Sequence, residues 1–140
     1  MIAAHNRARQ QYGVGPLAWD NRLARDAAAY AQTLARTNRF GHDPQRGRQP
    51  RQGENLWMGT RTAYSYGKMI GLLIDERRDF RPGRFPAVSR TGRWSDVGHY
   101  TQIVWPTTQR VGCATAANRV NEYLVCRYLP AGNIVGLVMR

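Results

Sequence analysis

The sequence predicts an α+β fold in which helices come first and antiparallel strands follow. Two observations favour this class. Apolar residues recur at helical spacing in the first half of the 140-residue chain, and short β-branched or aromatic runs separated by turn residues occupy the second half. This order is typical of helices packed on an antiparallel sheet. With 42% hydrophobic residues and no internal repeat or linker, residues 1–140 are expected to form one domain.

Three helices are expected in the first half. The first covers residues 1–12 and is stopped by Gly13. The second is capped by Asp20 and ends near Thr37. A third starts from a Thr62 cap and runs through Glu76 to about residue 78. The second helix has an apolar stripe with the spacing of one buried face, formed by Leu23, Ala27, Tyr30, Ala31 and Leu34.

Strands are expected at residues 101–105, 111–116 and 122–128, followed by a short apolar end at residues 134–139. Two long irregular segments rich in Pro, Gly and Arg lie before them, at residues 39–53 and 81–95. The first of these loops carries His42. Loops of this length in compact domains are often functional.

The two cysteines are predicted to form a disulfide. If the last two strands make an antiparallel hairpin that turns between Arg119 and Val120, Cys113 falls opposite Cys126. Directly paired residues lie within the separation that a disulfide requires. Such a bridge indicates an oxidising compartment. The alternative is two buried free thiols in a cytosolic protein.

The formal net charge is +12, and Lys68 is the only lysine among 21 basic residues. This charge favours anionic partners, such as anionic lipid or envelope polymers. Because the arginines are spread along the chain, the alternative is a solvated cationic surface on an exported protein whose genome favours arginine over lysine. No nucleic-acid recognition motif accompanies the charge, so specific nucleic-acid binding is not expected.

No run of about 18 apolar residues is present, so no transmembrane segment is expected. The chain shows no signal-peptide pattern and opens in a polar helical pattern, as a trimmed mature protein would. The expected location is therefore secreted or periplasmic, with a leader removed.

Several segments resemble a known family. Residues 98–105 read Gly-His-Tyr-Thr-Gln-Ile-Val-Trp, and residues 123–134 read Tyr-Leu-Val-Cys-Arg-Tyr-Leu-Pro-Ala-Gly-Asn-Ile. Three shorter matches occur in the same order: His5-Asn6-x-x-Arg9, Gly53-Glu54-Asn55-Leu56 and Val111-Gly112-Cys113. Together they resemble the CAP superfamily of cysteine-rich secretory, antigen 5 and pathogenesis-related-1 proteins, in a minimal bacterial type. The resemblance implies a three-layer α-β-α sandwich with a central antiparallel sheet.

The resemblance also implies an open cleft that holds two histidines and two acidic residues. Position by position, these are His42, Glu54, Glu76 and His99. His42 and His99 would ligate a divalent metal such as Zn²⁺, bound weakly or optionally, with Glu54 and Glu76 as nearby ligands or as groups that orient the imidazoles. The alternative is a hydrogen-bonded network that fixes loops to the sheet without a metal.

The function implied by the resemblance is a secreted binding module for a sterol, a fatty acid or another apolar ligand, or for envelope and host surfaces. The alternative is a metal-dependent, protease-like hydrolase in which Glu54 or Glu76 is the catalytic general base on metal-bound water. No His-Glu-x-x-His motif supports a protease. A Ser95–His99–Glu arrangement has less support, because no serine lies in a Gly-x-Ser-x-Gly elbow.

Other conspicuous residues are expected to have structural roles. His5 and Asn6 match the family outside the cleft and are expected to pack and hydrogen-bond the first helix to a neighbouring loop. Trp94, in the polar segment before residue 98, is expected to be exposed and available for binding. The other three tryptophans are expected in the core: Trp19, Trp57 and Trp105.

Overall fold

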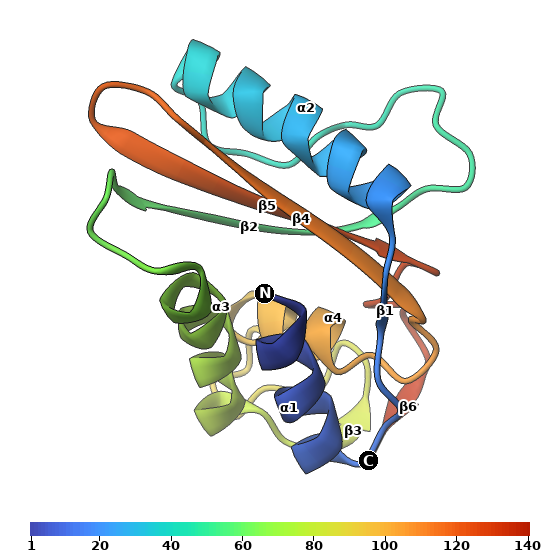
Figure 1. The fold of residues 1–140 in the computed structure, drawn as a ribbon. Helices are drawn as coiled ribbons and strands as arrows, with labels where there is room; N and C mark the ends of the chain where they lie inside the picture. The colour runs from blue at the N-terminus through green and yellow to red at the C-terminus, as the bar shows by residue number, and fades with distance from the viewer.

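The computed structural model describes all 140 residues and arranges them in three layers (Figure 1). Helix α2 (Asn21–Thr37) covers one face of the central sheet. The other face is covered by α1 (Ile2–Tyr12), α3 (Tyr66–Ile74) and α4 (Gly98–Ile103). Two 3₁₀ turns, Asp75–Asp79 and Trp94–Asp96, follow α3 and precede α4. The predicted α-β-α sandwich is confirmed.

The central sheet has the strand order β1-β4-β5-β2. Its strands are β1 (Ala18–Trp19), β2 (Gly53–Thr60), β4 (Arg110–Ala117) and β5 (Asn121–Leu129). β2, β5 and β4 are antiparallel neighbours, whereas the two-residue β1 joins the edge in parallel with β4, which the sequence analysis does not anticipate. A separate small sheet pairs β3 (Gly83–Arg84) with β6 (Val138–Met139).

The β4–β5 hairpin has the predicted register. Cys113 pairs directly with Cys126, and the two form a disulfide. Next to Cys113, Gly112 lets the start of α2 lie against the sheet, because a Cβ there would come within 2.2 Å of the backbone nitrogen of Ala24. The hairpin is thus stapled to itself and packed tightly under α2.

Alternation along β5 divides the core in two. Tyr123 and Val125 face α2, and Leu124, Cys126 and Tyr128 belong to the larger core on the other side. The α2 core is completed by Ala27, Ala31, Leu34 and Leu56. The period of two is that of a strand buried on both faces. By the same alternation, Arg127 lies on the α2 side.

The strand predicted at residues 101–105 is wrong, because residues 101–103 lie in helix α4 and residues 104 and 105 follow its end. The β-branched residues favour a strand locally, but contacts from elsewhere stabilise a short helix that is buried except at His99. At its start, the carboxylate of Glu76 accepts hydrogen bonds from the backbone N–H groups of His99 (3.0 Å) and Tyr100 (3.1 Å). These donors have no partner within the helix. A negative charge at this position also interacts favourably with the helix dipole.

The end of α4 is held by a buried arginine from α1. Arg9 is almost fully buried and has no carboxylate partner; its guanidinium donates to four backbone carbonyls. These belong to Gly15, Ile103, Trp105 and Thr108. A cation at the C-terminal end of a helix donates hydrogen bonds to the free carbonyls and interacts favourably with the helix dipole. Helix α4 therefore depends on side chains remote in sequence at both ends.

Two further boundaries differ from the expected ones. Ser65, not Thr62, caps α3, and its hydroxyl accepts from the backbone N–H of Lys68. The sequence analysis assigns no strand to residues 53–60, where the structure has β2, because two glycines and an asparagine weaken the local β signal.

The expected tryptophan environments are partly correct. Trp105 is fully buried, Trp57 packs at the edge of the core, and Trp94 is exposed, as expected. Trp19 is 40% exposed, because it lies on a two-residue strand at the sheet edge. No helix of the structure combines the length and the apolar character needed to cross a bilayer.

Asn6 has the expected role, exchanging two hydrogen bonds with the backbone of Leu17 (3.2 and 2.8 Å). His5 does not contact a loop. Its ring is buried against β5, where it meets the hydroxyl of Tyr128 at 2.7 Å. Burial lowers the pKa of His5 to about 4, so its imidazole is neutral at physiological pH.

Lowering the pH from 7 to 5 is expected to destabilise the protein by about 2 kcal/mol through His5. In the unfolded chain this imidazole has a pKa of 6.5, against about 4 in the folded protein. The unfolded state therefore binds a proton that the native state excludes, and stability falls as the pH falls through this window. Urea unfolding of the parent and of His5→Gln at both pH values measures the effect. An equal pH dependence in the two proteins would contradict it.

Candidate functional site

A polar cleft of about 490 Å³ opens where the loop before β2, the start of β2, helix α4 and the segment after β5 meet. Only two of its 16 lining residues are hydrophobic. His42, Glu54 and His99 line it, as the sequence analysis expects for the cleft. Glu76 does not line the cleft; it lies behind His99. The cleft is therefore lined mostly by polar and charged residues.

The carboxylate of Glu54 orients the ring of His42. Its Nδ1 lies 2.7 Å from Oε1 of Glu54, which also accepts from the backbone N–H of Asp43 at 3.1 Å. The side chain of His42 is 66% exposed and that of Glu54 only 4%. A buried carboxylate thus orients an exposed imidazole, and Nε2 is left without a protein partner.

The second oxygen of Glu54 accepts from Arg127, a residue that the sequence analysis does not single out. Arg127 lies directly opposite Glu54 in the β2–β5 pairing and is fully buried. Its Nε donates to Glu54 Oε2 at 2.9 Å, and its two terminal nitrogens donate to Gln52 (2.8 Å) and Asp43 (2.7 Å). The guanidinium also lies 5.5 Å from the ring centre of Tyr30. Each of the three guanidinium nitrogens of this buried cation therefore has an acceptor.

The loop that carries His42 is built around these contacts. Gln45 and Gln52 exchange side-chain-to-backbone hydrogen bonds, each at 2.9 Å, and the hydroxyl of Tyr30 donates to the carbonyl of Gly41. The pKa of Asp43 is lowered: burial opposes this, but hydrogen bonds from the Gln45 backbone and from Arg127 outweigh it. Asp43 therefore stays charged and keeps the loop anchored to the sheet.

His99 is oriented in the same way from the other side of the cleft. Its Nδ1 lies 2.7 Å from Oε2 of Glu76, while Oε1 holds the start of α4. Each cleft histidine therefore donates Nδ1–H to a carboxylate and keeps Nε2 available. Every oxygen of the two carboxylates accepts at least one hydrogen bond from the protein, so neither carboxylate has an oxygen without a partner.

The four predicted cleft residues do not gather three ligand atoms within 4.8 Å of one another. The group that does so consists of His5, Cys113 and Cys126, all buried and outside the cleft. These three form a possible metal site by residue type, although the two sulfurs are joined in the disulfide. The sequence analysis places neither the cysteines nor His5 in a metal site.

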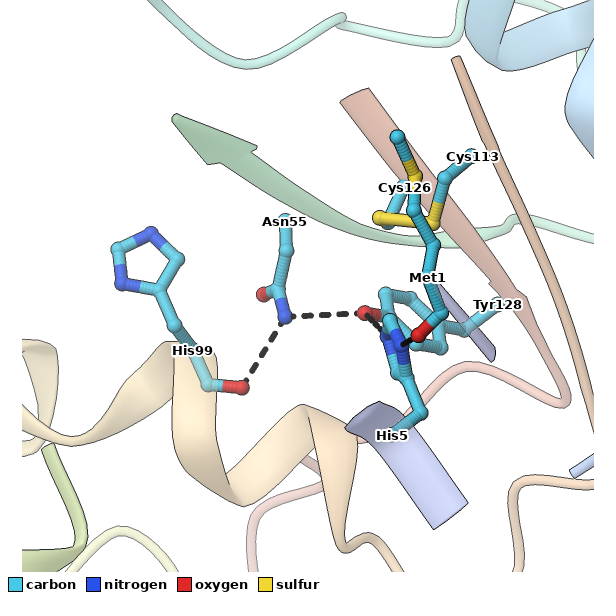
Figure 2. The surroundings of a disulfide bond; sticks show 7 residues. All are labelled: Met1, His5, Asn55, His99, Cys113, Cys126 and Tyr128. Atoms are coloured by element: carbon cyan, nitrogen blue, oxygen red, sulfur yellow. Dashed lines mark hydrogen bonds between the residues drawn. A yellow bond between two sulfur atoms is a disulfide. The ribbon is translucent and has the colours of Figure 1, made fainter. Parts of the chain in front are cut away.

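Figure 2 shows how this cluster is connected to the cleft. Nδ1 of His5 lies 3.0 Å from the carbonyl of Met1, so the hydroxyl of Tyr128 donates to Nε2. The amide of Asn55 in turn donates to that hydroxyl (3.2 Å) and to the carbonyl of His99 (3.0 Å). A continuous hydrogen-bonded chain thus runs from beside the disulfide to the backbone of His99.

No hydrogen bond joins Ser95 to His99, although both line the cleft. The expected exposure of Trp94 is confirmed, and its ring also lines the cleft. The ring lies over Gly98, where a Cβ would come within 2.7 Å of it. The structure therefore shows an aromatic rim but no assembled serine triad.

The sequence matches the "Cysteine-rich secretory protein family" (CAP) over residues 2–128. The chain therefore belongs to the CAP family.

Within the family it is a CAP-domain protein of the pathogenesis-related-1 and venom allergen type. The pathogenesis-related protein PR-1 type of Sambucus nigra is 35% identical over 136 residues, covering 96% of this chain and 77% of that protein. Venom allergen 5.02 of Dolichovespula maculata is 38% identical over 125 residues, covering 84% and 55%. The crystal structure of NaASP2 with Zn²⁺ matches with a TM-score of 0.79 at 24% sequence identity. The match covers 99% of this chain and 81% of the NaASP2 chain.

The sequence contains a pattern that predicts the burial of Arg127. Alternation places it on the same buried face of β5 as Tyr123 and Val125, and a buried arginine requires hydrogen-bond acceptors, of which carboxylates are the strongest. The preceding loop and strand offer Asp43 and Glu54. His5 carries no comparable signal, because nothing in its own helix indicates that it lies against the disulfide.

Replacing Arg127 by methionine is expected to lower the free energy of unfolding by about 3–5 kcal/mol, because the buried carboxylate of Glu54 loses its arginine partner and Asp43 and Gln52 lose their donor. Arg110→Met is the matched control: it removes an exposed ion pair with Asp20 and should cost at most about 1 kcal/mol. Urea unfolding at pH 7 measures both. Similar losses in the two variants would show that Arg127 does not anchor the His42 loop.

Proposed function

We propose that this CAP protein is a secreted binding module whose polar cleft holds a divalent cation between His42 and His99. One observation carries the proposal: each imidazole donates Nδ1–H to a carboxylate at 2.7 Å and keeps Nε2 available in the same cleft. A carboxylate behind a ligating histidine fixes the tautomer and raises the basicity of the ligand nitrogen. Glu54 and Glu76 then act as orienting groups, and water completes the coordination.

The choice of Zn²⁺ as the ion to test has two supports. Imidazole nitrogen is a good ligand for zinc. The crystal structure of NaASP2, which shares this fold, was determined with Zn²⁺. Two histidine ligands are fewer than a structural or hydrolytic zinc site uses, so the affinity expected here is weak.

Binding is favoured over hydrolysis by the state of the two carboxylates. A metal-dependent hydrolase would need Glu54 or Glu76 to take a proton from metal-bound water. Glu54 is engaged by His42, the Asp43 backbone and Arg127, and Glu76 by His99 and the start of α4. Freeing either carboxylate would release the imidazole that it orients.

Calorimetric titration of the oxidised protein with Zn²⁺ is expected to show about one weak site per chain. The double variant His42→Ala/His99→Ala should lose this site, because both ligand nitrogens are removed. His5→Gln alters the third histidine of the chain but keeps a side-chain acceptor for the Tyr128 hydroxyl, so it should leave the isotherm unchanged. Zinc binding that persists in the double variant would rule out the cleft as the site.

A second hollow supports the apolar ligand that the family resemblance implies. It has a volume of about 420 Å³, and six of its seven lining residues are hydrophobic. Ile2, Trp19 and Tyr66 contribute to its wall, beside the disulfide residue Cys113. We propose that a fatty acid or a similar apolar ligand binds here and not in the cleft, because burial of apolar surface is its main source of affinity.

Tyr66→Glu is expected to weaken binding of a fluorescent long-chain fatty acid by about tenfold, roughly 1.4 kcal/mol. The charge enters the wall of the hollow, while glutamate suits the first residue of a helix and should preserve α3. Val135→Glu, at another exposed apolar residue, is the control. Equal affinities in the parent and Tyr66→Glu would exclude the hollow.

Export and contact with anionic surfaces are proposed from more general features. The disulfide and the description of the family as secretory support an oxidising, extracellular environment. The net charge of +12 resides mainly on exposed arginines, which supports attraction to anionic envelope or host surfaces.

A further inference from the structure

Three side chains in the core gather the ligand types of a thiolate–imidazole metal site. His5, Cys113 and Cys126 each offer one ligand atom, and these atoms lie within 4.8 Å of one another. All three residues are buried. While the sulfurs are bonded to each other, they are not thiolates and hold no metal strongly.

We propose that opening of the Cys113–Cys126 disulfide converts this cluster into a Cys₂His site for Zn²⁺. A thiol reductant supplies two electrons and two protons; it becomes a disulfide, and the protein bond becomes two thiols. Zn²⁺ then replaces the two thiol protons, which pass to solvent, and His5 supplies the third ligand. The disulfide is therefore the closed state of a metal site.

The sheet keeps the ligands in place after the bond opens. Cys113 and Cys126 are directly paired in the β4–β5 ladder, and Cys126 is flanked on its other side by Asn55 of β2. Zinc–sulfur bonds of about 2.3 Å in tetrahedral geometry place two sulfurs about 3.8 Å apart. Sulfurs on paired residues reach this separation by rotation of their side chains, so the strands need not part.

The charges of the proposed site balance, which matters because it is buried. Two thiolates neutralise Zn²⁺, and an imidazole ligates a metal in its neutral form. The surroundings are the apolar side chains of the larger core. A neutral set of ligands and metal is tolerated there, whereas an uncompensated cation would not be.

The apolar hollow beside β4 provides access. Cys113 lines this hollow, whereas Cys126 is completely enclosed. The reductant therefore attacks the sulfur of Cys113, and Cys126 leaves as the thiolate. The same opening lets a water molecule occupy the fourth coordination position, since only three protein ligands are available.

Metal entry changes the hydrogen bonds of His5. Both ring nitrogens are engaged in the oxidised protein, by the Met1 carbonyl and the Tyr128 hydroxyl, so the metal must displace one of them. This cost is modest compared with the formation of two zinc–thiolate bonds.

The test uses protein reduced with dithiothreitol and desalted under nitrogen. Co²⁺ should give a thiolate-to-metal charge-transfer band, and Zn²⁺ should displace it at one equivalent per chain with release of two protons. The oxidised protein should give no band. His5→Gln should weaken binding by about 100-fold, because one of three protein ligands is lost. The cleft variant His42→Ala/His99→Ala should bind as the parent does, which separates this site from the cleft.

Loss of the disulfide costs stability, so the fold of the reduced protein is followed by circular dichroism in the same samples. If the reduced chain unfolds, Zn²⁺ should restore the native spectrum, because binding free energy then drives folding. Absence of the charge-transfer band, failure of Zn²⁺ to refold an unfolded reduced chain, or equal affinity in His5→Gln would each overturn the proposal.

Discussion

The cleft depends on one buried cation, the guanidinium of Arg127. A charge placed inside the sheet must be compensated where it lies, and its nearest partners are the groups that form the cleft. Glu54 is directly opposite on β2, and Asp43 and Gln52 come from the loop that carries His42. These contacts fix the path of a long loop rich in glycine, proline and arginine. Glu54 in turn fixes the orientation of the exposed imidazole of His42.

The opposite wall of the cleft is built on the same principle with the charges reversed. There a carboxylate, Glu76, holds the start of α4 and the ring of His99 together. Arg9 closes the other end of the helix through backbone carbonyls. The two cleft histidines are thus presented by rigid supports that are independent of each other. On the proposed function, a ligand that bridges His42 and His99 would link two separately anchored walls.

These supports explain which parts of the structure the sequence could predict. The α2 helix follows from its apolar stripe and its Asp20 cap, and the disulfide follows from the symmetry of a hairpin about residues 119 and 120. Both depend on neighbours in the chain. The sequence wrongly predicts a strand at helix α4, because the stability of this helix comes from Glu76 and Arg9, which lie far away in sequence. The cleft residues follow from resemblance to a family. Their pairing, with Glu76 behind His99 and outside the cleft, required the three-dimensional structure.

The cleft and the cysteine cluster share one piece of the sheet. Asn55, Cys126 and Cys113 are paired in a single row across β2, β5 and β4. Asn55 lines the cleft and holds the His99 carbonyl on one side and the Tyr128 hydroxyl on the other. Since Tyr128 also donates to His5, any change that withdraws His5 leaves that hydroxyl without its acceptor in the core, where an unsatisfied group is costly. Were Zn²⁺ to withdraw His5 as proposed, reorientation of Tyr128 would disturb its hydrogen bond from Asn55, the residue that also holds the backbone of His99. The Tyr128 hydroxyl is thus a group through which the proposed metal site would reach the cleft.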